Sequence, residues 1–178
     1  MNLGIEGKKA IITGGATGIG QAIAIDLAKE GAIVAISSRS QKSIDKTLKL
    51  LSEFGSDHYG IKNNITDEDG PLIIAENIQK NFGDIDIVVN NAGHTLNITD
   101  PYCDISDWRK VFRLNLEITI EINNIFLPHM KTQDWGRIVN ITSLAGLENS
   151  GPVTFSASKA ALTAYSRSMG RVLAIETS

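Results

Sequence analysis

Short apolar runs alternate along this chain with longer segments of helical period. Runs at 10–13, 33–36, 59–62, 85–89 and 138–141 predict five strands. Between them, apolar residues recur every three or four positions, which is typical of amphipathic helices. Helix-length crossovers indicate parallel pairing, because only a crossover returns the chain in the same direction. The pattern predicts a doubly wound parallel α/β sheet, covered by helices on both faces, with ligands at the carboxyl ends of the strands.

Polar residues and glycines mark where the predicted helices begin and end. Gly31 and Gly55 are expected to end the first two helices. Thr66 is the expected N-cap of the third helix, and Ser106 that of a long fourth helix. The residues expected to share one side of these helices are Ile19, Ile23 and Leu27, then Ile44, Leu48 and Leu51, then Leu72, Ala75 and Ile78, and finally Trp108, Phe112, Asn115 and Thr119.

Composition narrows the class of protein. The 178 residues carry a net charge of −3, and this length suits one domain. The single cysteine, Cys103, excludes an internal disulfide framework, and no metal-ligand spacing is present. Mild acidity argues against nucleic acid as a partner, and no apolar run reaches the roughly 20 residues that cross a bilayer. Without a secretory signal at the N-terminus, we expect a soluble, cytoplasmic protein that acts on a small molecule.

A glycine-rich turn joins the first predicted strand to the first helix. Gly14, Gly18 and Gly20 follow one another at the spacing G-x3-G-x-G. Glycines let the backbone approach a pyrophosphate closely, and the helix N-terminus offers free N–H groups and a positive dipole. A plain turn is the alternative. The position of the glycines in a strand–turn–helix unit at the start of the chain favours binding of a dinucleotide.

The end of the second strand bears on the choice of cofactor. In dinucleotide-binding sheets, an acidic residue about 20 residues beyond the glycines binds the ribose of NAD. Here the corresponding residues are Ser38 and Arg39, without an acid. A guanidinium binds a 2′-phosphate through bidentate, charge-assisted hydrogen bonds. The sequence therefore favours NADP(H) over NAD(H), with an ordinary solvated loop arginine as the alternative.

Further motifs resemble the short-chain dehydrogenase/reductase family. After the glycine turn come Asn90-Asn91-Ala92-Gly93 beyond the fourth strand, Asn115 in the long helix and Ser143 beyond the fifth strand. The resemblance covers nearly the whole chain in the family's order, and it implies a Rossmann fold and an NAD(P)(H)-dependent oxidoreductase. Within the family, the glycine turn and the Ser-Arg ending look like NADPH-using ketoacyl and enoyl-thioester reductases. The stretch 151–173 also looks like reductases of bacterial surface-sugar pathways.

The resemblance implies a role for each matching residue. Ser143 would hold the substrate carbonyl, Asn115 would distort its helix and hold a water, and Lys159 would grip the nicotinamide ribose. Taken singly, Asn115 or Ser143 could equally be a polar residue satisfied by the backbone. The implied cofactor-binding set is Gly14, Thr17, Gly18, Ile19, Gly20, Ser38, Arg39, Asn64, Ile65, Asn91, Ala92, Gly93 and Lys159, and the implied catalytic positions are Asn115, Ser143, Phe155 and Lys159.

Phe155 departs from the family pattern. The family's proton donor is the tyrosine of a YxxxK motif, and here Phe155 stands four residues before Lys159, on the same helix face. Phenylalanine keeps the ring but has no proton to transfer, and positioned acid–base catalysis contributes roughly 10²–10⁴ in rate. The substitution could be introduced, it could mark a natural nucleotide-binding protein without turnover, or Ser143 or a water held by Lys159 could supply the proton. We favour an enzyme scaffold that has lost its acid.

The length of the chain is a second departure. Family members continue past this helix into further strands, so we expect residues 1–178 to be a single, C-terminally incomplete dinucleotide-binding domain whose fifth strand is an exposed edge. Small residues line the last predicted helix, 155–175, at helical spacing: Ala157, Ala160, Ala161, Ala164 and Ser168. In the family such faces form homodimer or homotetramer interfaces, and packing within the monomer is the alternative.

The sequence thus leaves two main functions open. The favoured one is an NADP(H)-dependent oxidoreductase acting on a carbonyl, alcohol or activated double bond, attenuated by Phe155. The other is a non-catalytic nucleotide-binding or assembly module. His58, His94 and His129 have no metal-ligand spacing, and His94 is expected to be a polar loop residue.

Overall fold

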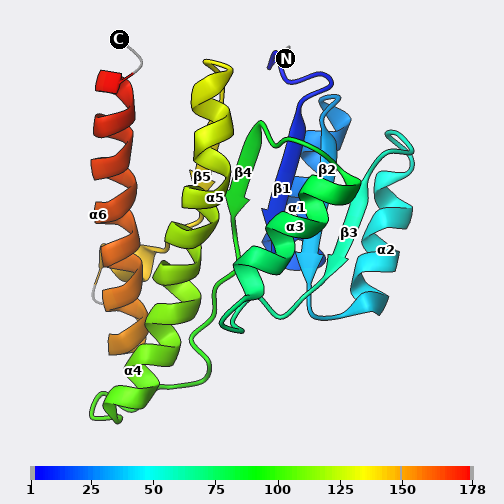
Figure 1. Ribbon diagram of the computed structural model, residues 1–178. Coiled ribbons are helices and arrows are strands. Elements are labelled where there is room, and N and C mark those ends of the chain that lie inside the picture. Colours follow the sequence, from blue (N-terminus) through cyan, green and yellow to red (C-terminus); the bar gives the residue numbers. More distant parts are fainter. Residues whose placement is uncertain (1–2, 149, 177–178) are drawn as a thin grey trace. The chain divides into compact units, whose positions relative to one another are not determined.

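Figure 1 shows the computed structural model, which describes residues 3–148 and 150–176. The elements, in chain order, are β1 (Lys9–Thr13), α1 (Gly18–Lys29), β2 (Ile33–Ser38), α2 (Gln41–Leu51), β3 (Tyr59–Lys62), α3 (Gly70–Asn81), β4 (Ile87–Asn90), α4 (Ile105–Phe112), the π-helix η1 (Arg113–Glu117), α5 (Ile118–Thr132), β5 (Arg137–Asn140), the 3-10 turn η2 (Leu144–Gly146) and α6 (Val153–Glu176). They form two compact units. Unit 1 comprises the chain up to Ala92 with Glu121–Val139, and unit 2 comprises Gly93–Ile120 with the chain from Asn140 onward.

The strands form one sheet in the order β3-β2-β1-β4-β5. The pairs are parallel, and Ile11 of β1 lies opposite Ala35 of β2 and Val88 of β4. All three residues are fully buried, and α1 and α3 lie on opposite faces of the sheet (Figure 1). The predicted doubly wound parallel α/β sheet is confirmed. β5 is the edge strand of the sheet, with Val139 45% exposed, so burial on both faces does not extend to this strand.

The helix α1 buries a different side from the one that its large apolar residues suggest, and α3 leaves one of its predicted inward-facing residues exposed. In α1 the buried residues are Gly20, Ala24 and Ala28, whereas Ile19 is 65% exposed. Small residues allow this helix to lie close to β1 and β2, and the bulky Ile23 and Leu27 are only half-buried. In α3 the buried apolar residues include Ile74 and Ile78, and Leu72 is 54% exposed.

The helix starts differ from the prediction at two places. Thr66 does not cap α3, because its Oγ1 donates to Asn64 Oδ1, and two successive turns delay the helix until Gly70. Asp69 is the N-cap instead.

The fourth helix begins one residue before the expected cap. Asp104 occupies the N-cap of α4, and its carbonyl accepts from the N–H groups of Asp107 and Trp108, so Ser106 lies inside the first turn. The predicted single long helix is also interrupted, because η1 separates α4 from α5.

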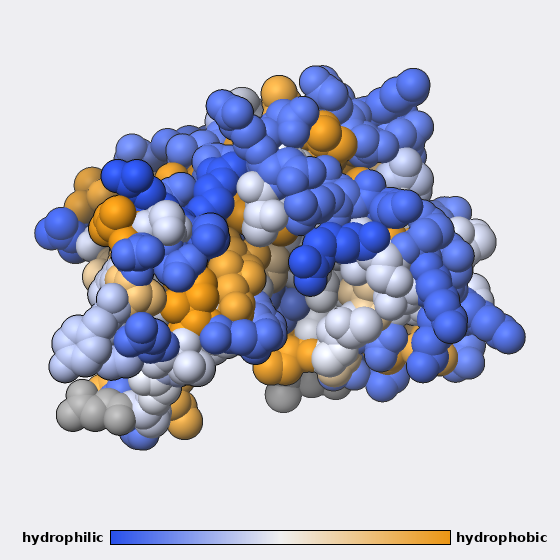
Figure 2. All heavy atoms as spheres, turned by 90° about the horizontal axis from the view of Figure 1, so that it is seen from below, coloured by the Kyte–Doolittle hydropathy of each residue, from blue (hydrophilic) through white to orange (hydrophobic). Residues whose placement is uncertain are grey.

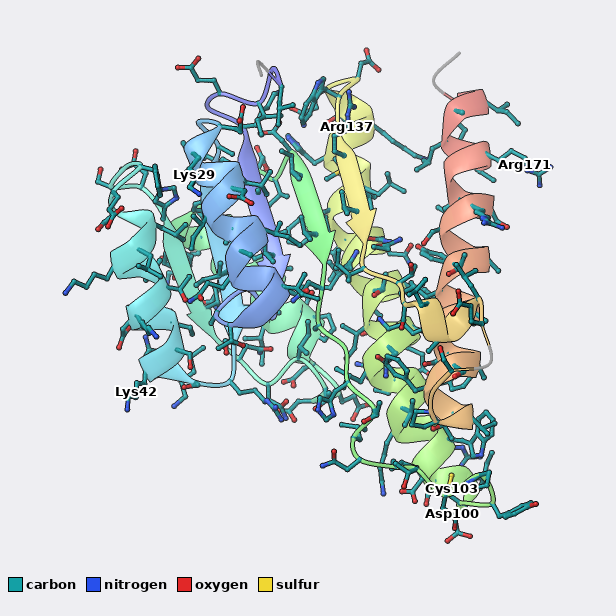
Figure 3. The ribbon with its side chains drawn as sticks, turned by 180° about the vertical axis from the view of Figure 1, so that it is seen from behind. Lys29, Lys42, Asp100, Cys103, Arg137 and Arg171 are labelled. Atoms are coloured by element: carbon teal, nitrogen blue, oxygen red, sulfur yellow. The ribbon has the colours of Figure 1, made fainter. Side chains whose placement is uncertain are left out.

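Unit 2 is built around α6. The helices α4 and η1 and the turn η2 pack against it, and the buried residues of α6 are Thr154, Ser158, Lys159 and Leu162. Of the small residues singled out in the sequence, Ala160, Ala164 and Ser168 are exposed. Arg171 points away from the helix in Figure 3. None of the helices in the described part of the chain is long and apolar enough to span a membrane.

Candidate active site

The glycine turn of unit 1 has a shape that side chains would destroy. Gly14 has a φ of +64°, which L residues rarely adopt. A Cβ on Gly20 would lie 2.5 Å from both Asn91 Nδ2 and Gly14 O. No side chain caps the N-terminus of α1 at Thr17, and Gly18, Ile19 and Gly20 form its first turn. This arrangement fits an anionic diphosphate, because backbone N–H groups can approach it without obstruction.

Thr13 and Asn91 hold this turn in place. Thr13 Oγ1 accepts from the N–H groups of Asn91 at 3.0 Å and Ala92 at 3.1 Å. The amide of Asn91 donates to Thr13 O and Gly14 O, each at 3.1 Å. The segment after β4 is thereby tied to the turn after β1. The sequence indicated Asn91 as a cofactor-lining residue but did not reveal that its side chain supports the turn, nor that Thr13 is the centre of the network.

Ser38 and Arg39 lie at the same edge of the sheet as the glycine turn, since Gly15 N donates to Ser37 O at 3.2 Å. Ser38 Oγ accepts from Ser40 N at 3.4 Å, within the loop that leads into α2. The side chain of Arg39 is exposed, and no hydrogen bond or ion pair engages its guanidinium within the described residues. Its charge is therefore available to a ligand.

Asn64 and Ile65 follow β3 at this edge. Asn64 Nδ2 donates to Asp67 Oδ1 at 2.5 Å, and its Oδ1 accepts from Thr66 Oγ1 at 2.9 Å. Ile65 is buried, and its carbonyl packs against Gly70 at the start of α3. Figure 2 is seen from the end to which the arrows of β1 and β2 point, and on its right, over α1, α2 and α3, hydrophilic residues cover most of the surface.

In unit 2, Asn115 lies at the centre of the π-helix η1 and is fully buried. Its Nδ2 donates to Val111 O and to His94 O, both at 2.9 Å, and its Oδ1 accepts from His94 N at 3.1 Å. One amide thus binds both backbone groups of His94. The helix distortion that the family resemblance implies is therefore present at Asn115. Such π-helical turns are rare and often occur at functional sites.

Lys159 is buried beside Asn115. Its side chain donates from Nζ to Ile141 O at 2.8 Å, and the residue is only 4% exposed. A Cβ on Gly93 would lie 2.9 Å from Asn115 Oδ1 and 3.0 Å from Lys159 Nζ, so only glycine leaves this pair undisturbed. Burial lowers the pKa of Lys159 to about 8, because removal from water disfavours the charged form.

Phe155 and Ser143 complete the predicted catalytic positions. The ring centroid of Phe155 lies 5.8 Å from Lys159 Nζ, one helical turn away on α6. Ser143 is the N-cap of η2, where its Oγ accepts from Ala145 N at 3.2 Å. A Cβ on Gly146 would lie 2.7 Å from the backbone of Lys159, so η2 sits directly on α6. Unit 2 thus brings Asn115, Lys159 and Phe155 together, with Ser143 on the adjoining turn.

Unit 2 also contains the only cysteine of the chain, Cys103. Cys103 and Asp100 lie together near the start of α4 (Figure 3). Desolvation and the charges of Asp107, Asp100 and Asp104 raise the pKa of the Cys103 thiol, which disfavours the reactive thiolate. Within residues 3–148 and 150–176, no three His, Cys, Asp or Glu side chains are grouped to hold a metal ion.

Comparison with known proteins identifies the class that this fold and site define. The short chain dehydrogenase family matches residues 8–177. The 3-oxoacyl-[acyl-carrier-protein] reductase FabG of Haemophilus influenzae is 33% identical over 171 residues, which cover 96% of this chain and 69% of that protein. The FabG of Aquifex aeolicus is 34% identical over 176 residues, covering 98% and 71%.

Solved structures agree with this result. L-sorbose reductase from Gluconobacter frateurii, complexed with NADPH and L-sorbose, superposes with a TM-score of 0.91 at 27% identity, covering 99% of this chain and 68% of that one. A 7α-hydroxysteroid dehydrogenase complexed with NADH and 7-oxo glycochenodeoxycholic acid gives a TM-score of 0.91 at 30% identity, covering 99% and 69%. The chain belongs to the short-chain dehydrogenase family. It is by class an NAD(P)-dependent oxidoreductase.

Proposed function

We propose that this protein is an NADP(H)-dependent oxidoreductase that interconverts a carbonyl and an alcohol in a small-molecule substrate, at a rate limited by Phe155. An activated double bond is the alternative substrate group. The observation that carries the proposal is Lys159, a lysine buried against Asn115 and Gly93. Lysine is almost never fully buried unless it is paired, and such perturbed groups gather at functional sites.

The preference for NADP(H) is supported by Arg39. The exposed guanidinium lies at the edge of the sheet that holds the glycine turn, and the loop offers no acid to a ribose 2′-hydroxyl. The two structural relatives hold NADPH in one case and NADH in the other. Family membership therefore does not distinguish NADP(H) from NAD(H), and the proposed preference for NADP(H) depends on Arg39.

The glycine turn, Ser143 and Phe155 have separate roles in the proposed mechanism. The nicotinamide, when bound, supplies or accepts the hydride. The backbone of Gly14, Gly18 and Gly20 would bind the diphosphate, as the glycine cradle allows. Ser143 can donate its hydroxyl proton in a hydrogen bond to the substrate oxygen while its Oγ accepts from Ala145. Phe155 can only pack against the substrate.

The exposed small residues of α6 support the further proposal of a homodimer or homotetramer. Ala160, Ala164 and Ser168 would let the helix of a second copy approach closely. Sedimentation of the purified chain tests this directly, and a monomer at micromolar concentration would contradict it.

The test of function uses the chain as it stands and the variant Phe155→Tyr. Calorimetry should detect NADPH binding to both, since the ring keeps its shape. With a panel of ketones and 3-oxoacyl thioesters, Phe155→Tyr should oxidise NADPH faster by roughly 10²–10⁴-fold, because a phenol beside Lys159 restores the positioned acid. Absence of nucleotide binding would overturn the proposal. Binding without turnover in either protein would instead indicate a non-catalytic nucleotide-binding module.

A further inference from the structure

We propose that Lys159 is itself the proton donor in this protein, acting on the substrate oxygen in the place of the phenol that Phe155 lacks. The inference rests on the proposed carbonyl–alcohol chemistry and names the residue that completes it. It gives Lys159 a chemical step in addition to the ribose binding that the family resemblance implies.

The other proton-bearing groups of unit 2 are poor donors for reasons that the geometry supplies. His94 Nδ1 accepts from Leu96 N at 2.8 Å, so this nitrogen carries no proton that it could donate to a substrate. The hydroxyl of Ser143 is a weak acid. Tyr165 stands ten residues beyond Phe155 on α6, which is not a spacing that places the two on one helix face.

Lys159 has both the protons and the position. An ammonium carries three N–H donors, and within the described residues Nζ uses one of them, toward Ile141 O at 2.8 Å. The ring of Phe155 lies within 5.8 Å of Nζ, so a substrate oxygen placed against this ring is within reach directly or through one water. The absence of a side chain at Gly93 lets Nζ approach the backbone there, because a Cβ on Gly93 would lie 3.0 Å from Nζ.

Two cationic side chains on the elements that pack against α6 are paired with acidic neighbours on their own elements. Arg113 of η1 lies 3.9 Å from Glu117, and Lys110 of α4 lies 2.8 Å from Asp107. The turn η2 contributes no titratable side chain, and Nδ1 of His94, on the loop before α4, accepts from Leu96 N. Burial is accordingly the cause of the lowered pKa of Lys159, about 8, which makes its ammonium a stronger acid than an exposed lysine.

In the direction of reduction, the hydride would come from NADPH, which would be oxidised to NADP⁺ as its C–H bond breaks. The carbonyl carbon receives this hydride, and the electron pair of the C=O π bond moves to the oxygen. One Nζ–H bond of Lys159 breaks, its proton forms the O–H bond of the alcohol, and the electron pair stays on Nζ as a neutral amine. A proton from solvent then restores the ammonium. In oxidation the neutral amine accepts the alcohol proton.

The first measurement is the pH profile of ketone reduction by the chain with Phe155 in place. kcat/KM should be level below pH 8 and fall about tenfold for each further unit, as Lys159 loses its proton. Lys159→Arg keeps the charge but cannot release a proton in this range, so reduction should fall by roughly 10²-fold or more while the Kd for NADPH stays within a few-fold. Lys80→Arg, an exposed lysine of α3, is the matched control and should leave both quantities unchanged.

The second measurement does not depend on turnover. In protein with labelled lysines, the NMR signal that Lys159→Arg removes should titrate near pH 8 in the absence of substrate. The inference is overturned if that signal does not titrate between pH 7 and 9, if Lys159→Arg reduces ketones as fast as the parent, or if the parent shows no turnover. The proposed function fails separately, if neither protein binds NADPH or if Phe155→Tyr also shows no turnover, whereas a gain in Phe155→Tyr with no role for Lys159 overturns this inference alone.

Discussion

The glycine turn of unit 1 and the Lys159 cluster of unit 2 treat their polar groups in opposite ways. Around the turn, the side chains of Thr13 and Asn91 form hydrogen bonds with the backbone. A ligand can therefore bind the backbone of the turn and the N-terminus of α1. Around Lys159, a charge is buried with one carbonyl acceptor. The turn therefore strengthens the fold while it forms a binding site, whereas Lys159 weakens the fold to keep a reactive group.

The largest effect that we expect is a pH dependence of the unfolding free energy that comes from Lys159. Lys159 has a pKa of about 8 in the folded chain against 10.5 for the free side chain, so between these two pH values the unfolded state holds a proton that the folded state has lost. Stability should rise with pH between these two values, by about 3 kcal/mol in total, at 1.36 kcal/mol for each unit of pKa shift. Lys159→Met should abolish this rise. Urea unfolding of both proteins at pH 7 and pH 10 measures it, and parallel curves would contradict it.

The next effect breaks the glycine turn. Gly20→Ala would place a methyl group 2.5 Å from Asn91 Nδ2 and from Gly14 O, so the turn must shift. We expect a loss of about 1–3 kcal/mol in unfolding free energy, the usual cost of overpacking, together with weaker NADPH binding. Gly170→Ala is the control, because a Cβ at Gly170 on α6 meets nothing within 4 Å. If both variants behave alike in thermal unfolding and calorimetry, the turn is not as tightly built as the structure indicates.

A smaller effect concerns cofactor choice. Arg39→Ala should weaken NADPH binding by about tenfold or somewhat more, the value of a charge-assisted hydrogen bond, and leave NADH nearly unaffected. Isothermal titration with both nucleotides gives the two ratios. Lys42→Ala, which removes a neighbouring exposed charge from α2, controls for long-range attraction. Equal weakening of both nucleotides by Arg39→Ala would show that Arg39 does not recognise the 2′-phosphate.

The smallest effect is a pH dependence in unit 1. His58 Nδ1 accepts from Val34 N at 3.0 Å, and burial lowers the pKa of His58 although the charge of Asp57 opposes this. Because the folded form resists protonation, this contribution to stability is present above pH 6.5 and is lost as the pH falls below it. His58→Asn should flatten thermal unfolding temperatures between pH 7 and pH 5. An unchanged slope would mean that another group titrates.

The sequence predicted the elements better than their orientation. The five strands followed from apolar runs, but α1 turns Gly20, Ala24 and Ala28 inward, since a helix that closely approaches a sheet needs small residues more than large ones. The start of α3 was misplaced because a hydroxyl can bond a nearby side chain as readily as a helix N–H, which is what Thr66 does with Asn64.

The candidate site followed from motifs, but its supporting contacts did not. Asn115, Phe155 and Lys159 could be aligned by their spacing to the family. The clamp of Asn115 on both backbone groups of His94, and the network of Thr13 with Asn91, join residues that are distant in the chain. No local pattern records such pairings, and only the folded backbone brings them within hydrogen-bonding distance.

The π-helix η1 carries a consequence for how this protein can change over generations. A π turn holds one residue more than the α turn that it replaces, so deleting a single codon between 113 and 117 would join α4 and α5 into one regular rod. The residues on either side would keep their helical register, because the extra residue is accommodated within the π turn itself. A protein lineage that needs the amide of Asn115 must therefore keep the π turn. A lineage that no longer needs this amide can obtain a regular α-helix by deleting one residue.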